Sequence, residues 1–276
     1  MSRSQCTGEK NFRCAAYLCN IIDTHNIIDT HIMFSLQMGK MVVYCFCMTM
    51  AKERKHMGKL IVFEGTDGSG KATQTELLCQ ALETQGVPFR RLSFPRYQEE
   101  SSALVRLYLG GASGSHPDDV NAYAAATFYA VDRYASYQQD WGEYYRQGGL
   151  LIADRYTTSN AVHQTSKLPP EQRQSFLDWL FHFEYDLLGL PRPTRVLYLD
   201  LPTELSEQMM RLREQATHTT ADVHEQDEAY LRRCRENAAF VTEYCGWTRI
   251  DCARNGVMRS REEIHAEVMD KLRDLL

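Results

Sequence analysis

The sequence lacks any Cys-X-X-Cys pair, although it contains nine cysteines. Their irregular spacing argues against a zinc site or a disulfide framework and predicts reduced thiols in a cytoplasmic protein. No apolar run is long enough to cross a bilayer, so no membrane partner is expected. A basic excess is also missing: the net charge is −5, which makes nucleic acid a poor candidate partner. The chain has 276 residues, of which 43% are hydrophobic, and this suffices for a full α/β core.

The first 56 residues differ from the rest of the chain. They hold five of the nine cysteines and a direct repeat, Asn20–His25 followed by Asn26–His31. Their apolar part begins too deep for a signal peptide, and polar residues interrupt it. Because Met57 directly precedes the first predicted strand, we expect it to be the true start and residues 1–56 to be a non-native or disordered extension. A metal-binding role for the Cys and His residues there is the weaker alternative.

One glycine-rich segment carries most of the functional information. A short apolar run over residues 60–64 predicts a strand, and the spacing Gly-X-X-X-X-Gly-Lys follows from Gly65 to Lys71, ahead of an amphipathic helix. Backbone N–H groups of such a loop, together with the helix N-terminus, form a cradle for phosphate groups. A flexible turn without a ligand would explain the glycines but not the lysine. Ala72 stands where a Ser or Thr is usual, and the first hydroxyl comes at Thr73.

Strands and helices alternate through the remainder. Further strands are predicted over residues 89–94, 150–153, 196–199 and 247–251, and helices over 102–109, about 118–146, 170–188, 204–213, 224–244 and 262–275. Residues 214–222 are polar and aperiodic and predict a mobile loop. Continuously apolar strands predict a parallel five-stranded sheet flanked by helices, in one domain over residues 57–276.

Polar residues at the strand ends are the candidates for function, since ligands bind at that edge of a parallel sheet. Arg96 follows the second strand and could grip a phosphate, although a solvated loop arginine is an equal alternative. Asp154 and Arg155 follow the third strand and could hold Mg²⁺ and neutralise a phosphoryl group, or simply pair with each other. Asp200, after the fourth strand, is the weaker metal candidate and more plainly structural.

Tyr129 and Arg133 lie four residues apart in the long predicted helix, so the ring and the guanidinium share one face. That pair could bind a base. On spacing alone we favour the alternative, in which Tyr129 is a core aromatic and Arg133 a surface charge.

Together these motifs resemble the thymidylate kinase family over about residues 58–276. The resemblance depends on their joint order: F-E-G-x-D-G-x-G-K-x-T, F-P-R, an aromatic residue four positions before D-R, D-R-Y-x-x-S-N, and D-x-H-E at Asp222, His224 and Glu225. It implies a P-loop nucleoside monophosphate kinase that transfers the γ-phosphoryl group of ATP to dTMP, giving dTDP and ADP. It also implies Mg²⁺, held mainly by the phosphates, with Asp154 and Thr73 as candidate ligands, and it allows a homodimer formed through helices.

The family's roles transfer to matching positions of this chain. The implied ATP site comprises Gly65, Thr66, Asp67, Gly68, Ser69, Gly70, Lys71, Ala72 and Thr73, with Arg211 and Arg213 at the edge of a lid over about residues 211–223. The implied dTMP site comprises Asp67, Phe94, Arg96, Tyr129, Arg133, Arg155, Asn160 and His163. The implied catalytic residues are Lys71, Arg155, Asp154 and Asp67.

Within the dTMP site, the resemblance assigns a task to each group. Asp67 would face the 3′-hydroxyl of the sugar, and Arg96 and Arg155 would bind the acceptor phosphate. Phe94 and Tyr129 would line the thymine pocket. Arg133 would hydrogen-bond a thymine carbonyl, and Asn160 the region of the ring N–H.

Three departures from the family pattern keep other functions open. Ala72 lacks the hydroxyl usual for Mg²⁺, and residues 214–223 contain no Lys or Arg, so arginine help for the donor phosphate would come from Arg155, Arg211 or Arg213. His163 stands where Tyr or Phe usually faces C2′ of the sugar. The alternatives are therefore a kinase for another nucleotide or nucleoside, or a nucleotide-binding regulator that has lost catalysis.

Overall fold

The computed structural model describes residues 57–217, 223–224 and 227–276, without the side chains of 213–217. The expectation for residues 1–56 lies outside these residues and stays a prediction. So does most of the predicted loop over 214–222. None of the described helices is long and apolar enough to cross a bilayer.

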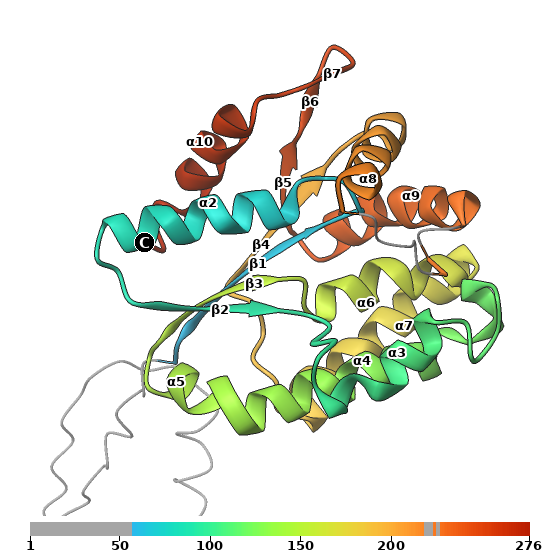
Figure 1. The fold of residues 1–276 in the computed structure, drawn as a ribbon. Helices are drawn as coiled ribbons and strands as arrows, with labels where there is room; N and C mark the ends of the chain where they lie inside the picture. Colours follow the sequence, from blue (N-terminus) through green and yellow to red (C-terminus); the bar gives the residue numbers. More distant parts are fainter. Residues whose placement is uncertain (1–56, 218–222, 225–226) are drawn as a thin grey trace, which may run out of the picture. The chain divides into compact units, whose positions relative to one another are not determined.

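Five parallel strands form the central sheet in the order β2-β3-β1-β4-β5, which confirms the predicted fold (Figure 1). They are β1 (Lys59–Gly65), β2 (Phe89–Ser93), β3 (Leu150–Asp154), β4 (Arg195–Asp200) and β5 (Thr248–Asp251). From β1 the chain crosses to one side of the sheet, and from β3 it crosses to the other. The carboxyl ends of β1 and β3 therefore border the crevice in which such sheets bind ligands.

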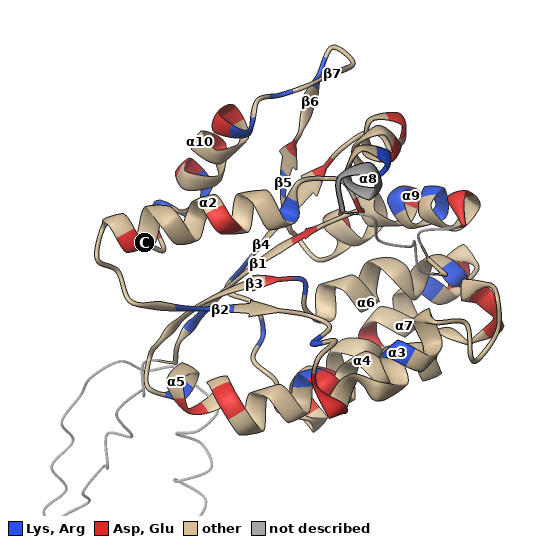
Figure 2. Ribbon diagram, in the orientation of Figure 1, with Lys and Arg blue, Asp and Glu red and all other residues tan. Residues whose placement is uncertain are grey.

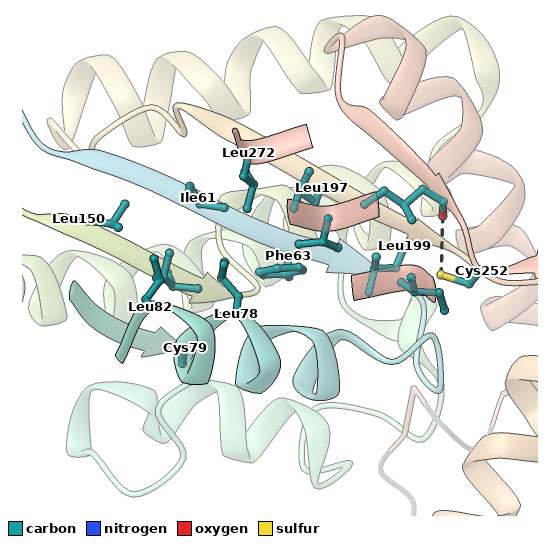
Figure 3. Close-up of a cluster of buried hydrophobic side chains, with 14 of the residues drawn as sticks. Ile61, Phe63, Leu78, Cys79, Leu82, Leu150, Leu197, Leu199, Cys252 and Leu272 are labelled. Atoms are coloured by element: carbon teal, nitrogen blue, oxygen red, sulfur yellow. Dashed lines mark hydrogen bonds between the residues drawn. The ribbon is translucent and has the colours of Figure 1, made fainter. Parts of the chain in front are cut away.

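Both faces of the sheet are buried, as the continuously apolar strands predict. On one face, α2 (Lys71–Thr84) and α10 (Arg261–Leu272) cover Ile61, Phe63 and Leu197 (Figure 3). Leu60 and Val62 point to the other face, where they pack with Tyr137, Trp141 and Leu151. Alternation along the strand thus supplies both hydrophobic layers.

The second face carries most of the remaining helices (Figure 1). These are α3 (Ala103–Leu109), α4 (Ala122–Ser136), α5 (Gly142–Arg146), α6 (Thr157–His163), α7 (Pro170–Phe181) and α9 (Glu228–Tyr244). A π-helical turn over Tyr137–Trp141 joins α4 to α5, and another over His182–Leu187 extends α7. Helix α8 (Thr203–Thr217) follows β4.

Four local expectations need correction. The long helix begins after Asn121, whose side chain accepts from Ala124 N at 2.9 Å, and not at Asp118 or Asp119, which lie in a 3₁₀ turn. Helix α6 was missed because it has only seven residues and little periodicity. Helix α8 runs on to Thr217, beyond the predicted end, and the short hairpin of β6 (Ala253–Arg254) and β7 (Val257–Met258) was also missed.

The loop between β1 and α2 depends on left-handed glycine backbone. Gly68 has φ 79° and Gly70 has φ 92°, a region that residues with a Cβ rarely adopt. A Cβ on Gly68 would also lie 2.5 Å from the Ser206 carbonyl oxygen, because α8 begins close against the loop. Position 68 is therefore closed to any larger residue by both conformation and space.

We expect Gly68→Ala to lower the free energy of unfolding more than the control Gly86→Ala. Gly86 has φ 67°, but a Cβ added there would meet nothing within 4 Å, so its substitution costs only the left-handed conformation, about 1–2 kcal/mol. Gly68→Ala adds a clash with backbone, worth at least about 1 kcal/mol more. Urea unfolding measures both; equal losses would contradict the close approach of α8.

Candidate active site

Lys71 and the start of α2 lie beside the carboxyl end of β1. The Lys71 ammonium is buried and donates to the carbonyl oxygens of Gly65 and Thr66 at 2.8 and 2.9 Å. Burial, and next the nearby charge of Arg155, lower the pKa of Lys71. Gly70 precedes the helix and offers no side-chain cap to its first N–H groups. Those groups and the helix dipole are thus available to an anion.

Arg155 connects β3 to this loop. It follows Asp154 with left-handed backbone (φ 66°), a conformation that costs a non-glycine residue about 1 kcal/mol or more and is concentrated at functional sites. Its guanidinium donates to Asp67, whose carboxylate also lies 3.7 Å from the Lys71 ammonium. Burial alone would lower the pKa of Arg155, but Asp67 and then Glu64 more than offset this and raise it. Figure 2 colours the Asp and Glu residues red and the Lys and Arg residues blue along the strands and helices.

Glu64, which sequence reasoning placed only as the end of a strand, is a buried partner of this group. Its side chain is 0% exposed and accepts from Gly65 N at 2.9 Å and from the hydroxyls of Thr158 and Ser159 at 2.7 Å each. Arg155 Nη1 approaches it to 3.7 Å. Glu64 therefore joins β1, Arg155 and the first turn of α6.

Arg96 is placed by a second buried carboxylate that sequence reasoning missed, Asp132 of α4. Asp132 accepts from Arg96 N at 2.9 Å and from Ser101 Oγ at 2.6 Å, and Arg96 Nε lies 3.4 Å from its Oδ1. Two residues before Arg96, Phe94 N donates to the Asp154 carbonyl oxygen at 3.1 Å. Arg96 and Arg155 thus follow neighbouring strand ends, as predicted.

A third buried carboxylate, Glu184, holds Arg133. Glu184 lies in the π-helical turn after α7, and its side chain is 0% exposed. It accepts from Arg133 Nε at 2.7 Å and Nη2 at 2.5 Å, from Thr157 Oγ1 at 2.6 Å and from Asn160 Nδ2 at 3.1 Å. Arg133 is therefore not the surface charge that spacing favoured; burial would lower its pKa, but Glu184 raises it.

His163 lies in a buried aromatic cluster at the end of α6. Its ring stacks on that of His224 at a centroid distance of 5.8 Å, and its Nδ1 lies 3.5 Å from Cys234 Sγ. His224 Nε2 lies 2.8 Å from the Tyr108 hydroxyl, which also accepts from Lys167. Burial, and then the charge of Arg155, lower the pKa of His163 well below its usual value. Burial, and then Lys167, lower that of His224 to about 3.

The remaining predicted site residues are placed as follows. Thr66 and Ser69 are buried in the loop, and their hydroxyls have no hydrogen-bond partner among the described residues. Phe94 is buried against Tyr156 at 5.9 Å between ring centroids, and Tyr129 lies edge-on to Tyr108 at 6.5 Å. Tyr129 thus belongs to an aromatic cluster, as the spacing favoured.

The first residue of the predicted lid, Arg211, lies on α8. Arg211 is 68% exposed and lies 4.0 Å from Glu207. The side chain of Arg213, residues 218–222 and Glu225 lie outside the described part of the chain. Asp200 pairs with Arg249 at 2.7 Å and with Arg235 at 3.6 Å, in line with the structural role expected for it.

The donor set near the loop fits a magnesium ion that arrives with phosphates. No three His, Cys, Asp or Glu side chains of the described residues gather as a metal site of their own. Ala72 and Thr73 are exposed, and Asp154 is half-buried at the end of β3. Mg²⁺ is commonly bound by one or two carboxylates with substrate phosphates, and Asp154 could supply such a carboxylate.

The sequence and the fold are similar to those of known proteins. Residues 63–268 match the family model of thymidylate kinase. The thymidylate kinase of Mycobacterium tuberculosis H37Rv is 32% identical over 176 residues, 63% of this chain and 81% of that protein. That of Caenorhabditis elegans is 26% identical over 227 residues, covering 79% and 96%. A solved thymidylate kinase from Candida albicans has the same fold, with a TM-score of 0.56 at 19% identity over 79% of this chain and 92% of that one.

The buried histidines make stability depend on pH. Because the folded protein holds the pKa of His224 near 3, the unfolded chain binds the proton first as pH falls below about 6.5. The stabilisation is present above that pH and is lost on acidification. We expect the unfolding free energy of the wild type to fall about 1.4 kcal/mol per pH unit more steeply than that of His224→Gln between pH 6 and 4. Urea unfolding of both proteins at several pH values measures this, and equal slopes would contradict the burial of His224 in its neutral form.

Proposed function

This chain belongs to the thymidylate kinase family, and from that premise we propose that it transfers the γ-phosphoryl group of ATP to dTMP, giving dTDP and ADP for dTTP synthesis. The observation that carries the proposal is the group of Lys71, Asp67 and Arg155 at the ends of β1 and β3, beside an uncapped helix N-terminus. Two phosphate groups placed there would meet cations from both sides.

The donor end is the loop itself. The N–H groups at the start of α2, the Lys71 ammonium and the hydroxyls of Thr66 and Ser69 would bind the ATP phosphates. The unpartnered state of those two buried hydroxyls supports this, because buried polar atoms normally have partners. A phosphate would also compete with the Lys71 contacts to the carbonyl oxygens of Gly65 and Thr66.

The acceptor phosphate would lie between Arg155 and Arg96, whose forks suit two-point contact with phosphate oxygens. A phosphate near Arg155 would displace the Asp67 carboxylate from its guanidinium. Asp67 would then be available to the 3′-hydroxyl of the acceptor sugar. Such a transfer needs alignment and charge neutralisation rather than covalent chemistry from the protein.

The base would lie farther along the cleft, against Phe94 and Tyr129, with Arg133 and Asn160 at its polar edge. His163 would face the sugar. Because His163 replaces the Tyr or Phe usual at this position, the second candidate function is a kinase that accepts nucleotides with other sugars.

Magnesium, when bound with ATP, would neutralise charge on the phosphates. Asp154 is the carboxylate that fits it, directly or through water, while Ala72 offers no hydroxyl and Thr73 remains a candidate one residue further on. Arg211 and Arg213 would approach the donor phosphates from α8.

An acceptor screen tests the function. With ATP and Mg²⁺ we expect ADP release with dTMP, weaker release with dUMP, and little with UMP, CMP or AMP. Turnover only with UMP or AMP would replace dTMP kinase by a kinase for another nucleotide. Binding of ATP without turnover on any acceptor would instead indicate a regulator that has lost catalysis.

Arg155→Ala should leave the fold intact and lower kcat/KM for dTMP by about 10²-fold or more, since it removes a preorganised contact to the transferring group. Arg249→Ala removes an arginine that is 57% exposed and pairs with Asp200 and Asp251 rather than with a loop residue, and it should keep near-wild-type turnover. Coupled ADP release and urea unfolding measure both variants. Full activity of the Arg155 variant would show that the acceptor clamp is misplaced.

A further inference from the structure

Two polar atoms of the residues bonded to Glu184 take no part in its hydrogen bonds. Arg133 uses Nε and Nη2 on Glu184, which leaves Nη1. Asn160 donates Nδ2 to Glu184 and to the Ala126 carbonyl oxygen at 3.0 Å, which leaves Oδ1. Within the described residues neither remaining atom has a hydrogen-bond partner, and neither is sealed from solvent. A ligand here would meet one donor, Arg133 Nη1, and one acceptor, Asn160 Oδ1.

The orientation of the Asn160 amide follows from its partners. A carbonyl oxygen and a carboxylate oxygen can only accept, so the amide nitrogen must face Ala126 and Glu184. Turning the amide over would set Oδ1 against two acceptors and lose both bonds. Glu184 thus fixes which end of the Asn160 amide is left for a ligand, and the same carboxylate fixes the plane of the Arg133 guanidinium through two parallel bonds.

We propose that Glu184 is the positioning residue that sets base specificity at this site, an inference that depends on the proposed function. Thymine and uracil present an acceptor, O4, beside a donor, N3–H. That pair matches Arg133 Nη1 and Asn160 Oδ1. Cytosine presents the reverse pair, an amino donor beside an unprotonated N3, so both contacts would oppose like groups. Sites that hydrogen-bond one such group reject the mismatched analogue by about 10⁴-fold.

The carboxylate is necessary for this selection because all four of its lone-pair positions are taken. One oxygen accepts from Arg133 Nη2 and Asn160, and the other from Arg133 Nε and Thr157. Glutamine has nearly the same shape but one oxygen and one NH₂ group. An NH₂ group in place of Oε1 would oppose both Arg133 Nη2 and Asn160 Nδ2. The guanidinium and the amide would then no longer be held in one orientation, which weakens the selection against cytosine.

The test compares kcat/KM for dTMP, dUMP and dCMP at saturating ATP in the wild type, Glu184→Gln and Asp132→Asn. We expect the wild type to prefer dTMP over dCMP by at least about 10³-fold, and Glu184→Gln to lower that ratio at least about tenfold, chiefly through a higher KM for dTMP. The KM for ATP should not change. Asp132→Asn also removes a buried carboxylate beside an arginine, but at the phosphate end, so it should weaken dTMP and dCMP alike and keep the ratio.

The three proteins test the positioning role and the kinase function separately. An unchanged ratio in Glu184→Gln overturns the positioning role while the kinase function stands. An equal fall of the ratio in Asp132→Asn overturns it too, because any nearby buried charge would then suffice. A wild type that phosphorylates none of the three nucleotides overturns the proposed function itself.

A second variant covers the case in which Glu184→Gln does not unfold cooperatively in urea. Glu184→Asp keeps the negative charge but draws the carboxylate back by one methylene, away from Asn160. We expect the dTMP-to-dCMP ratio to fall in the same direction. A folded Glu184→Asp with the wild-type ratio overturns the proposal.

Discussion

Three arginines of the site, Arg155, Arg96 and Arg133, each lie beside a buried carboxylate, and the arrangement of the site depends on these pairs. Glu64 lies beside Arg155, Asp132 beside Arg96, and Glu184 beside Arg133. A buried guanidinium without a partner would be costly, and a partner with full hydrogen bonding both lowers that cost and fixes the plane of the fork. The three carboxylates are themselves almost fully buried, at 0–1% exposure, so they cannot turn away to water.

Helix α6 ties two of these pairs together. The hydroxyls of Thr158 and Ser159 donate to Glu64, while Thr157 and Asn160 donate to Glu184. Four consecutive residues of one short helix therefore set the separation between the Glu64 and Glu184 carboxylates. A helix of seven residues would be marginal alone in water, and here its first turn is held by charge-assisted hydrogen bonds on both sides.

Sequence reasoning placed the sheet, the phosphate loop and the strand-end arginines, because each has a local signal: a continuous apolar run, a fixed glycine spacing, or a charge directly after a strand. The carboxylates carried no such signal. Glu184 is one acidic residue in the polar sequence His182-Phe-Glu-Tyr-Asp186, and its burial arises from a π-helical turn that turns it inward to α4 and α6. Asp132 stood in the D-R motif but drew attention only as the neighbour of Arg133. The error about Arg133 has the same origin, since helical spacing shows which residues share a face but not which face is covered.

Paired arginines also explain why lysine would not serve equally in these positions. A lysine carries a single ammonium group. Once that group pairs with a buried carboxylate, the side chain has no second nitrogen to direct at a ligand. An arginine can donate Nε and one terminal nitrogen to its carboxylate and still present the other terminal nitrogen in the same plane. Arg133 has this arrangement with Glu184. For a reaction that depends on alignment, this matters more than the charge itself: the partner immobilises the fork before a nucleotide arrives, so less orientational freedom is lost when it binds. The cost of burying these acidic residues is offset by that preorganisation.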